Sequence, residues 1–394
     1  MTSAVMPTYA RAPVTFAKGE GCRLIDTEGR RYLDFGAGIA VCGLGHAHPK
    51  LIEALTKQAN TLWHTSNLYR VEGQEKVAAK LAALSFGDVV FFANSGAEAN
   101  ECSIKLARRY HASRGNPDKW RILAFEGSFH GRTLATLAAA GNPKNLAGFG
   151  PIVTGFDHAP YGDLEKAAAL VGPDTAAILV EPIQGEGGIR VPPADFLNWL
   201  RALADKHGAL LMFDEVQCGL ARSGKLFAHE RFGVVPDVMS LAKTLGGGFP
   251  VAACVATAKA ASGMTAGSHA STFGGNLLAM AVASTVLDII AEPAFLADVA
   301  RKGEKLASGL DAVVKRHPNV FEQRRGVGLM QGLRCAGAQG EVVDRLRDAG
   351  LIVVPAQDKI IRLIPPLVVI EQEIDEALSI LDSVARSMPA KAAA

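Results

Sequence analysis

The sequence predicts an α/β protein, in which a large domain holds a mostly parallel seven-stranded sheet between helices and a smaller α+β domain is built from the N- and C-terminal segments. Three observations support this prediction. Between about residues 86 and 260, short runs that are apolar on both faces alternate with helical stretches, a pattern typical of a parallel sheet covered on each side. After Phe273 the pattern changes to long helices and short strands. The length of 394 residues is also enough for two or three domains.

The strands of the large domain are expected, in chain order, at Val89–Phe92, Ile122–Phe125, Ala177–Val180, Leu210–Phe213, Val238–Leu241 and Val251–Val255. Helices are expected through Ile104–Tyr110 and at Phe196–His207. The last two strands are joined by the segment AKTLGGGFP, which is shorter than the dozen or more residues of a helical crossover. That pair should therefore be antiparallel, so one strand of about seven is expected to run in reverse.

The smaller domain is expected to contain helices at Leu277–Ile290 and Phe295–Arg316, strands near Gly328–Leu333 and Ile360–Leu363, and a closing amphipathic helix at Ile374–Ala385. The alternating segment Cys22–Leu33, with a turn at Glu28–Gly29, is typical of a hairpin that could join this domain. We therefore expect residues 1–60 to form an N-terminal segment of the small domain, residues 61–285 the large domain, and residues 286–394 the rest of the small domain.

Composition excludes several classes of protein. The 41 Lys plus Arg and 39 Asp plus Glu leave a formal charge of +2, without the clustered positive excess that nucleic-acid binding requires. No run of 18 or more uncharged apolar residues is present, so no membrane span is expected. The six cysteines lie far apart with no C-x-x-C pair, which disfavours a metal site and a disulfide framework.

Four motifs follow predicted strands, where open α/β sheets bind their ligands. The first is NSGAEAN at Asn94–Asn100, whose small residues would let a phosphate reach the free N–H groups of a helix start. The alternative is that Ser95 is an N-cap with no ligand. In the second, GSFHGRT at Gly127–Thr133, Phe129 could stack on a planar cofactor and Arg132 could hold a carboxylate. Core packing and a surface ion pair are the alternatives for these two.

The third motif, LLMFDEVQ, delivers Asp214 at the end of an apolar strand, where a buried carboxylate needs a cation or donor. An N-cap is the alternative. In the fourth, Lys243 follows an apolar strand and precedes three glycines, and it could act as an amine nucleophile rather than a surface lysine. A phosphate cradle, a stacking ring, an anionic partner for a ring nitrogen and a Schiff-base lysine are together what pyridoxal 5′-phosphate requires.

The sequence resembles the class III, fold-type-I aminotransferases, and among them the acetylornithine aminotransferases most closely. The resemblance runs from about Tyr9 to Val369 through the ordered motifs YLDFGAGIAVCGLGHAHP, NSGAEAN, FHGRT, VEPIQGEGG, FDEVQCGLARSG, AKTLGGGFP, HASTFGGN and RGVGLMQG. It implies that a homodimer uses pyridoxal 5′-phosphate to transfer the terminal amine of N-acetyl-L-ornithine to 2-oxoglutarate, giving N-acetylglutamate semialdehyde and glutamate in arginine biosynthesis. The eight residues ahead of Tyr9 are too few for a transit peptide, which favours the cytoplasm.

The resemblance also implies the site residues. Lys243 should carry the cofactor and Asp214 should pair with its ring nitrogen, so these two are the expected catalytic residues. The other expected cofactor contacts are Ser95, Gly96, Ala97, Phe129, Glu215, Val216 and Gln217, together with Thr272, which should reach the cofactor of the partner subunit. The expected substrate contacts are Ile39, Arg132, Glu186, Ser271 and Arg362.

Substrate choice depends on charge. Arg132 and Arg362 are candidates for the two carboxylates of glutamate, and Glu186 matches a family glutamate that masks such an arginine while the other substrate is bound. At the position of Ile39, free-ornithine aminotransferases carry a tyrosine that meets the α-amine of the substrate. Isoleucine offers that charged amine no hydrogen bond, which favours an acylated substrate.

Alternatives within the same fold are ornithine, succinylornithine or γ-aminobutyrate aminotransferases, an aminomutase, and an enzyme that also accepts succinylated diamino acids of lysine biosynthesis. From another class, a nicotinamide-dependent dehydrogenase is disfavoured because no G-x-G-x-x-G follows a strand.

Overall fold

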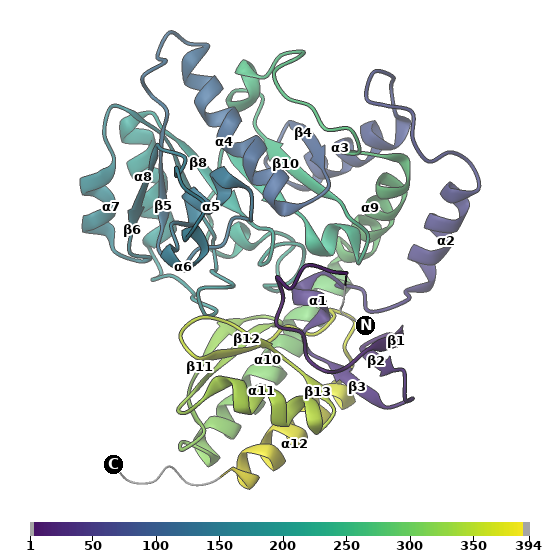
Figure 1. Ribbon diagram of the computed structural model, residues 1–394. Coiled ribbons are helices and arrows are strands. Elements are labelled where there is room, and N and C mark those ends of the chain that lie inside the picture. The colour runs from purple at the N-terminus through teal and green to yellow at the C-terminus, as the bar shows by residue number, and fades with distance from the viewer. Residues whose placement is uncertain (1–3, 389–394) are drawn as a thin grey trace.

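A seven-stranded sheet forms the centre of the larger part of the molecule (Figure 1). The computed structural model describes residues 4–388. Across the sheet the strands follow the order β4 (Val89–Ala93), β10 (Ala252–Ala256), β9 (Val238–Leu241), β8 (Leu210–Asp214), β7 (Thr175–Val180), β5 (Arg121–Phe125) and β6 (Phe156–Ala159). β10 is antiparallel to both of its neighbours, and the remaining pairs are parallel. The predicted mostly parallel sheet with one reversed strand is confirmed.

Helices cover both faces of this sheet because its strands are apolar on both sides. Ala177 and Leu179 of β7 pack in one cluster with α4 (Gly96–Ala112), whereas Ile178 and Val180 pack in another with α8 (Phe196–His207). Every residue of β7, β8, β9 and β10 is buried, as expected of strands between two helical layers. The other helices of this part are α2 (Pro49–Ala59), α3 (Glu72–Leu84), α5 (Leu134–Ala140), α6 (Pro143–Leu146), α7 (Leu164–Leu170) and α9 (Leu277–Ile290), with short 3-10 turns at Ala228–Arg231, Lys243–Gly246 and Ala260–Gly263.

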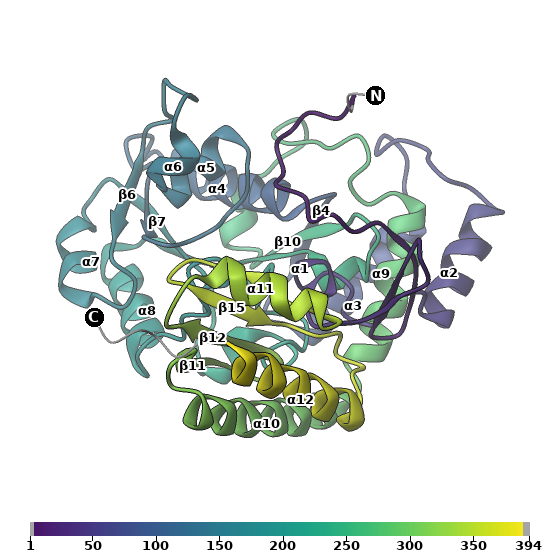
Figure 2. The same ribbon diagram turned by 60° about the horizontal axis from the view of Figure 1, so that its bottom comes forward.

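Two four-stranded sheets form the smaller part, at the bottom of Figure 1. One has the order β1 (Phe16–Glu20), β2 (Arg23–Asp26), β3 (Arg31–Asp34) and β13 (Leu351–Ile352). The other has the order β11 (Phe321–Val327), β12 (Met330–Cys335), β15 (Ile360–Leu363) and β14 (Val354–Pro355). The accompanying helices are α1 (Ala37–Ala40), α10 (Pro293–Arg316), α11 (Gln339–Asp348) and α12 (Glu371–Ser387). Figure 2 shows α10 and α12 side by side on the outer surface.

The N-terminal segment joins the C-terminal one as the sequence predicts. β13 pairs in parallel with β3, so both ends of the chain contribute to one sheet. The predicted hairpin is also present, since β2 is antiparallel to β3 and Gly29 in its turn has a φ of +84°, a conformation that glycine adopts readily. The domain boundaries near residues 60 and 285 stay a prediction, and residues 1–3 and 389–394 of the predicted ranges lie outside the described residues.

The carboxyl ends of the strands converge. Because β4, β5, β7, β8 and β9 run in one direction, the loops after them meet at one edge of the large sheet.

Between residues 4 and 388, no single helix has the length and composition of a membrane span, although α9 and α10 pass that test as a pair bent by 72°.

Candidate active site

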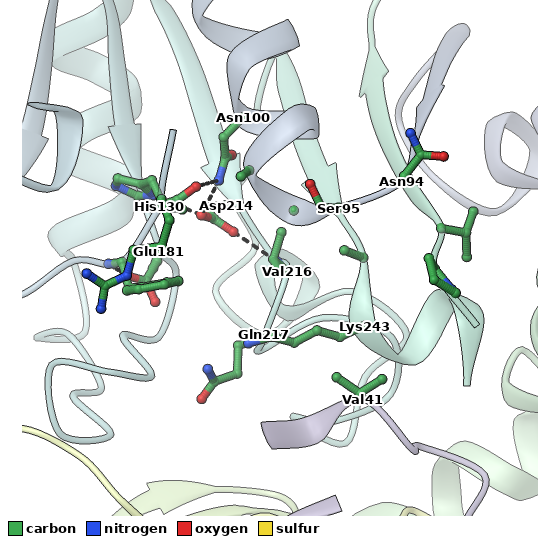
Figure 3. A pocket seen from close by; sticks show the side chains of 18 of the residues that line it. Val41, Asn94, Ser95, Asn100, His130, Glu181, Asp214, Val216, Gln217 and Lys243 are labelled. Atoms are coloured by element: carbon green, nitrogen blue, oxygen red, sulfur yellow. Dashed lines mark hydrogen bonds and ion pairs between the residues drawn. The ribbon is translucent and has the colours of Figure 1, made fainter. Parts of the chain in front are cut away.

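A cavity of about 430 Å³ lies at this edge of the sheet (Figure 3). It is lined by six separate segments of the chain, so residues that are far apart in the sequence meet around one space. Of the residues predicted from the sequence, the lining contains Ser95, Gly96, Ala97, Phe129, Arg132, Asp214, Val216, Gln217 and Lys243. It also contains Asn100, His130 and Glu181, to which the sequence assigned no role at the site, and Val41 from the N-terminal segment.

Asp214 is the last residue of β8, and its side chain is almost fully buried, with 3% of its surface exposed. Its Oδ2 accepts hydrogen bonds from Asn100 Nδ2 at 2.7 Å and His130 Nδ1 at 2.8 Å, and its Oδ1 accepts one from the Val216 N–H at 3.0 Å (Figure 3). A carboxylate offers about four acceptor positions, so one remains for a donor in the cavity. These bonds keep the buried charge compensated and aimed at the cavity.

Lys243 follows β9 and reaches toward the same space (Figure 3). Its φ of +51° lies in the left-handed region, which residues with a side chain rarely adopt and which is frequent at functional sites. Burial lowers the pKa of the Lys243 amine to about 8, and the positive charge of Arg362 acts in the same direction. More of the amine is therefore neutral near pH 7 than in an exposed lysine, as a nucleophile requires.

The start of α4 lines the same cavity as the lysine, and its role as a phosphate site stays a prediction. Ser95 is the N-cap of this 17-residue helix, and its side chain accepts a hydrogen bond from the Glu98 N–H at 3.3 Å. The other N–H groups of the first turn have no acceptor inside the helix, so they can bind a phosphate. A Cβ on Gly96 would lie 2.8 Å from Val216 Cγ1, so glycine is required there. Ser95 therefore caps the helix, as one of the two alternatives predicts, and it also lines the cavity, while its contact to a phosphate stays a prediction.

Phe129 and Arg132 form another wall. Phe129 is half-buried, and the guanidinium of the exposed Arg132 lies 5.5 Å from the centre of its ring. Cation–π attraction at this distance holds the arginine at the cavity rim. The Phe129 ring lies where it can cover one face of a planar ligand.

Glu181 directly follows β7 and is 5% exposed. Its Oε1 accepts a hydrogen bond from the Phe129 N–H at 2.8 Å, and its Oε2 accepts one from the Gly185 N–H at 3.0 Å. Burial raises the pKa of Glu181, and the nearby negative charge of Asp214 adds to the effect. The sequence carries a usable signal, because Glu181, like Asp214, is a carboxylate placed directly after an apolar run, residues 176–180 for Glu181 and residues 210–213 for Asp214.

Arg362 of β15 is 1% exposed and is not part of the cavity lining, but it contacts the lining residue Gln217. Its Nη1 donates to Glu186 Oε1 at 2.5 Å and to Gln217 Oε1 at 3.1 Å, and its Nη2 donates to the Pro355 carbonyl at 3.0 Å. The predicted meeting of Glu186 and Arg362 is therefore observed as an ion pair, next to a glutamine that lines the cavity. Its role as a switch stays a prediction.

Glu215 does not face the cavity. Its carboxylate, 1% exposed, accepts hydrogen bonds from the N–H and the Nδ1 of His229, both at 2.8 Å, and from the N–H of Ala228. These donors occupy the carboxylate of Glu215, and the predicted contact of this residue to the cofactor stays a prediction. The carboxylate anchors the turn at residues 228–231.

Like Glu186, Arg362 and Glu215, three other expected contacts lie outside the lining of this cavity. Ile39 is 41% exposed, with φ of +64°, and lies in the same loop as the cavity residue Val41. Ser271 Oγ accepts hydrogen bonds from Asn94 Nδ2 at 3.3 Å and from the N–H of Gly274 at 3.0 Å. Thr272 is exposed, which a contact to the cofactor of another subunit would require. The roles of all three stay predictions.

These features fit pyridoxal 5′-phosphate. The spare acceptor position of Asp214 suits a protonated ring nitrogen, the start of α4 suits the phosphate, and the Lys243 amine suits the aldehyde. Together with the α/β fold, they define a pyridoxal-phosphate-dependent enzyme. Residues 5–385 match the class-III aminotransferases, and the chain belongs to that family.

Similar proteins agree with this assignment. The chain is 56% identical over 377 residues to an acetylornithine aminotransferase of Mesorhizobium japonicum, which covers 96% of this chain and 94% of the relative. The structure of this chain is similar to that of the N-acetylornithine aminotransferase of Stenotrophomonas maltophilia, with a TM-score of 0.84 and 38% identity. The match covers 96% of this chain and 97% of the other. The structure is also similar to that of the ornithine aminotransferase of Toxoplasma gondii, with a TM-score of 0.94, 32% identity and coverage of 98% and 93%.

Proposed function

We propose that this aminotransferase transfers the terminal amine of N-acetyl-L-ornithine to 2-oxoglutarate, forming N-acetylglutamate semialdehyde and glutamate, as in arginine biosynthesis. The similarity to acetylornithine aminotransferases supports this substrate. The observation that carries it is the ion pair between the buried Arg362 and the partly exposed Glu186, beside Gln217. 2-Oxoglutarate has two carboxylates, whereas N-acetylornithine has one, which lies far from the reacting amine. A site that binds both substrates needs a cation that can be neutralised when the second carboxylate is absent.

When bound, the cofactor supplies a ring that takes up the electron pair released as the substrate carbon loses its proton. Lys243 would bind the cofactor through its amine. When the amine is free, it would move the proton between the amine-bearing carbon of the substrate and the C4′ carbon of the cofactor. Asp214 would keep the ring nitrogen protonated, since a buried carboxylate stabilises a nearby cation. His130 and Asn100 orient Asp214 through their hydrogen bonds to its Oδ2. Phe129 would cover the ring and exclude water.

The remaining residues would select the substrate. Arg132, at the rim, would bind the carboxylate of the acylated ornithine. Arg362 would be neutralised by Glu186 in that half-reaction and would bind a carboxylate of 2-oxoglutarate once Glu186 moves away. The apolar Ile39 would offer the α-nitrogen no hydrogen bond, which suits an uncharged amide better than an ammonium group.

We further propose a homodimer in which Thr272 reaches the cofactor of the partner subunit. Large exposed side chains near Thr272 support it, because apolar surface of this kind usually marks an interface. They are Trp63, Leu68, Tyr69 and Phe273, with 63%, 88%, 71% and 59% of their surface exposed. Asn67 Nδ2 donates to the carbonyls of Ser271 and Gly274 at 2.9 and 3.0 Å, so the segment around Asn67 and the segment around Thr272 form one surface.

A cytoplasmic location stays a prediction.

The test of the substrate is kcat/KM on a panel of N-acetylornithine, succinylornithine, succinyl-diaminopimelate, ornithine and γ-aminobutyrate, with 2-oxoglutarate as acceptor. We expect the acylated ornithines to be the best substrates, because they match the apolar and cationic groups described above. A higher kcat/KM for ornithine or γ-aminobutyrate would contradict the proposal.

A further inference from the structure

Glu181 lines the cavity (Figure 3) and joins the loop that holds Phe129, which also lines the cavity, to the loop that begins at Gly185. One oxygen of its buried carboxylate accepts the N–H of Phe129 at 2.8 Å, and the other accepts the N–H of Gly185 at 3.0 Å. The carboxylate thus spans two main-chain segments that are 56 residues apart in the sequence (129 to 185). Nothing in the reaction steps described above uses it.

The two loops carry different functions. The first loop holds the Phe129 ring in the cavity wall. The second begins at Gly185, directly before Glu186, whose carboxylate binds Arg362. This second loop is closed by paired main-chain hydrogen bonds of 3.0 Å between Gln184 and Arg190. The bond from Gly185 to Glu181 is therefore a direct link between the position of Glu186 and the wall that holds Phe129.

Crowding around Gly185 explains why this link must be well defined. A Cβ at Gly185 would lie 2.2 Å from Gln217 Oε1, and this same oxygen accepts a hydrogen bond from Arg362. A shift of the Gly185 main chain therefore affects both Gln217 and the adjacent Glu186, which are the two side chains that bind Nη1 of Arg362.

We propose that Glu181 is a positioning residue whose carboxylate fixes the Glu186 loop relative to the Phe129 loop, and that it thereby supports the half-reaction in which Glu186 must neutralise Arg362. This inference rests on the proposed function for the identity of that half-reaction. A carboxylate suits the task because both of its oxygens accept hydrogen bonds, whereas an amide accepts with one end and donates with the other.

The variant Glu181→Gln tests the proposal because it keeps the shape and removes one acceptor. We expect the amide oxygen to retain the shorter bond, to Phe129, and the amide nitrogen to face the Gly185 N–H. In single-turnover experiments on the holoenzyme, the rate with N-acetylornithine should fall about tenfold relative to the rate with glutamate, comparable to the loss of one hydrogen bond to a charged group. In hydrogen–deuterium exchange, peptides covering residues 184–190 should exchange faster, and those covering 127–131 should not.

Asp26→Asn is the matched control. Asp26 is 9% exposed and also accepts two main-chain hydrogen bonds, from Glu28 at 3.0 Å and Arg30 at 2.8 Å, but it belongs to the N-terminal hairpin. This variant should lose stability without changing the ratio of the two single-turnover rates or the exchange of residues 184–190. The proposal is overturned if Glu181→Gln keeps the wild-type ratio and exchange, or if Asp26→Asn changes the ratio equally. If the wild-type enzyme itself does not react with N-acetylornithine, the proposed function fails, and the exchange experiment still decides whether Glu181 holds the loop.

Discussion

Replacement of Asp214 by asparagine should slow proton removal from the substrate while leaving the fold intact. The side chain is 3% exposed, and its three hydrogen bonds come from Asn100, His130 and the main chain of Val216. Asparagine has nearly the same shape but carries no charge. Its NH2 group is itself a hydrogen-bond donor and would face one of the three groups that donate to Asp214. The ring nitrogen of the cofactor would then lose the charge that keeps it protonated.

The size of the effect follows from burial. Breaking a buried charge pair by removing one partner costs about 3–5 kcal/mol. If this loss appears in the transition state for proton removal, it slows that step by roughly 10²- to 10⁴-fold, at about 1.4 kcal/mol per factor of ten. The cofactor should still bind, because the start of α4 and Lys243 are unchanged.

The assay is stopped-flow absorbance with saturating N-acetylornithine, and separately with glutamate, in a single turnover. Asp237→Asn is a suitable control, because Asp237 also accepts a main-chain hydrogen bond, from Leu211 at 2.8 Å, and pairs with Arg201 at 2.7 Å outside the cavity. A wild-type rate of proton removal in Asp214→Asn, or an equal loss in Asp237→Asn, would refute the role assigned to Asp214.

Three further predictions concern neighbouring parts of the site. Burial lowers the pKa of Lys243 to about 8, and only the neutral amine is nucleophilic. The rate at which cofactor-free enzyme takes up pyridoxal 5′-phosphate should therefore rise with pH through about 8. A rise only above about pH 10 would contradict this prediction. Thr272→Ala should weaken cofactor binding by about 10- to 100-fold if the Thr272 hydroxyl binds the phosphate, and unchanged cofactor affinity would exclude the contact. Hybrid dimers of a Thr272→Ala subunit with a Lys243→Ala subunit should show activity that neither parent homodimer explains. Glu186→Ala should lower kcat/KM for N-acetylornithine while glutamate reacts as well or better, as differential binding requires, and equal losses in single-turnover rates would argue against a switch.

The sheet could be predicted because most of its strands are buried on both faces and therefore appear as continuous apolar runs, such as residues 176–180 of β7. β6 was not predicted, since its sequence FDHA is short and half polar. It lies at the edge of the sheet, pairs with a single strand, and three of its four residues are only half-buried.

Most of the cavity could also be predicted, because motifs that follow parallel strands converge at one edge. Two kinds of information were not accessible. The bonds of Asp214 to His130 and Asn100 join residues 84 and 114 positions apart, which no local pattern reveals. The direction of a side chain next to a strand end is equally hidden, since neighbours in an extended chain point to opposite faces, and Glu215 accordingly turns away from the space that Asp214 faces.

The most direct test of the account is to locate the covalent attachment of the cofactor. The holoenzyme would be reduced with borohydride and digested, and its peptides would be identified by mass spectrometry. We expect a phosphopyridoxyl group on Lys243, the loss of the visible absorption band on reduction, and no labelled peptide from Lys243→Ala treated in the same way. A label on another lysine of the wild-type enzyme, or an unchanged absorption band, would contradict the assignment of this cavity as the active site.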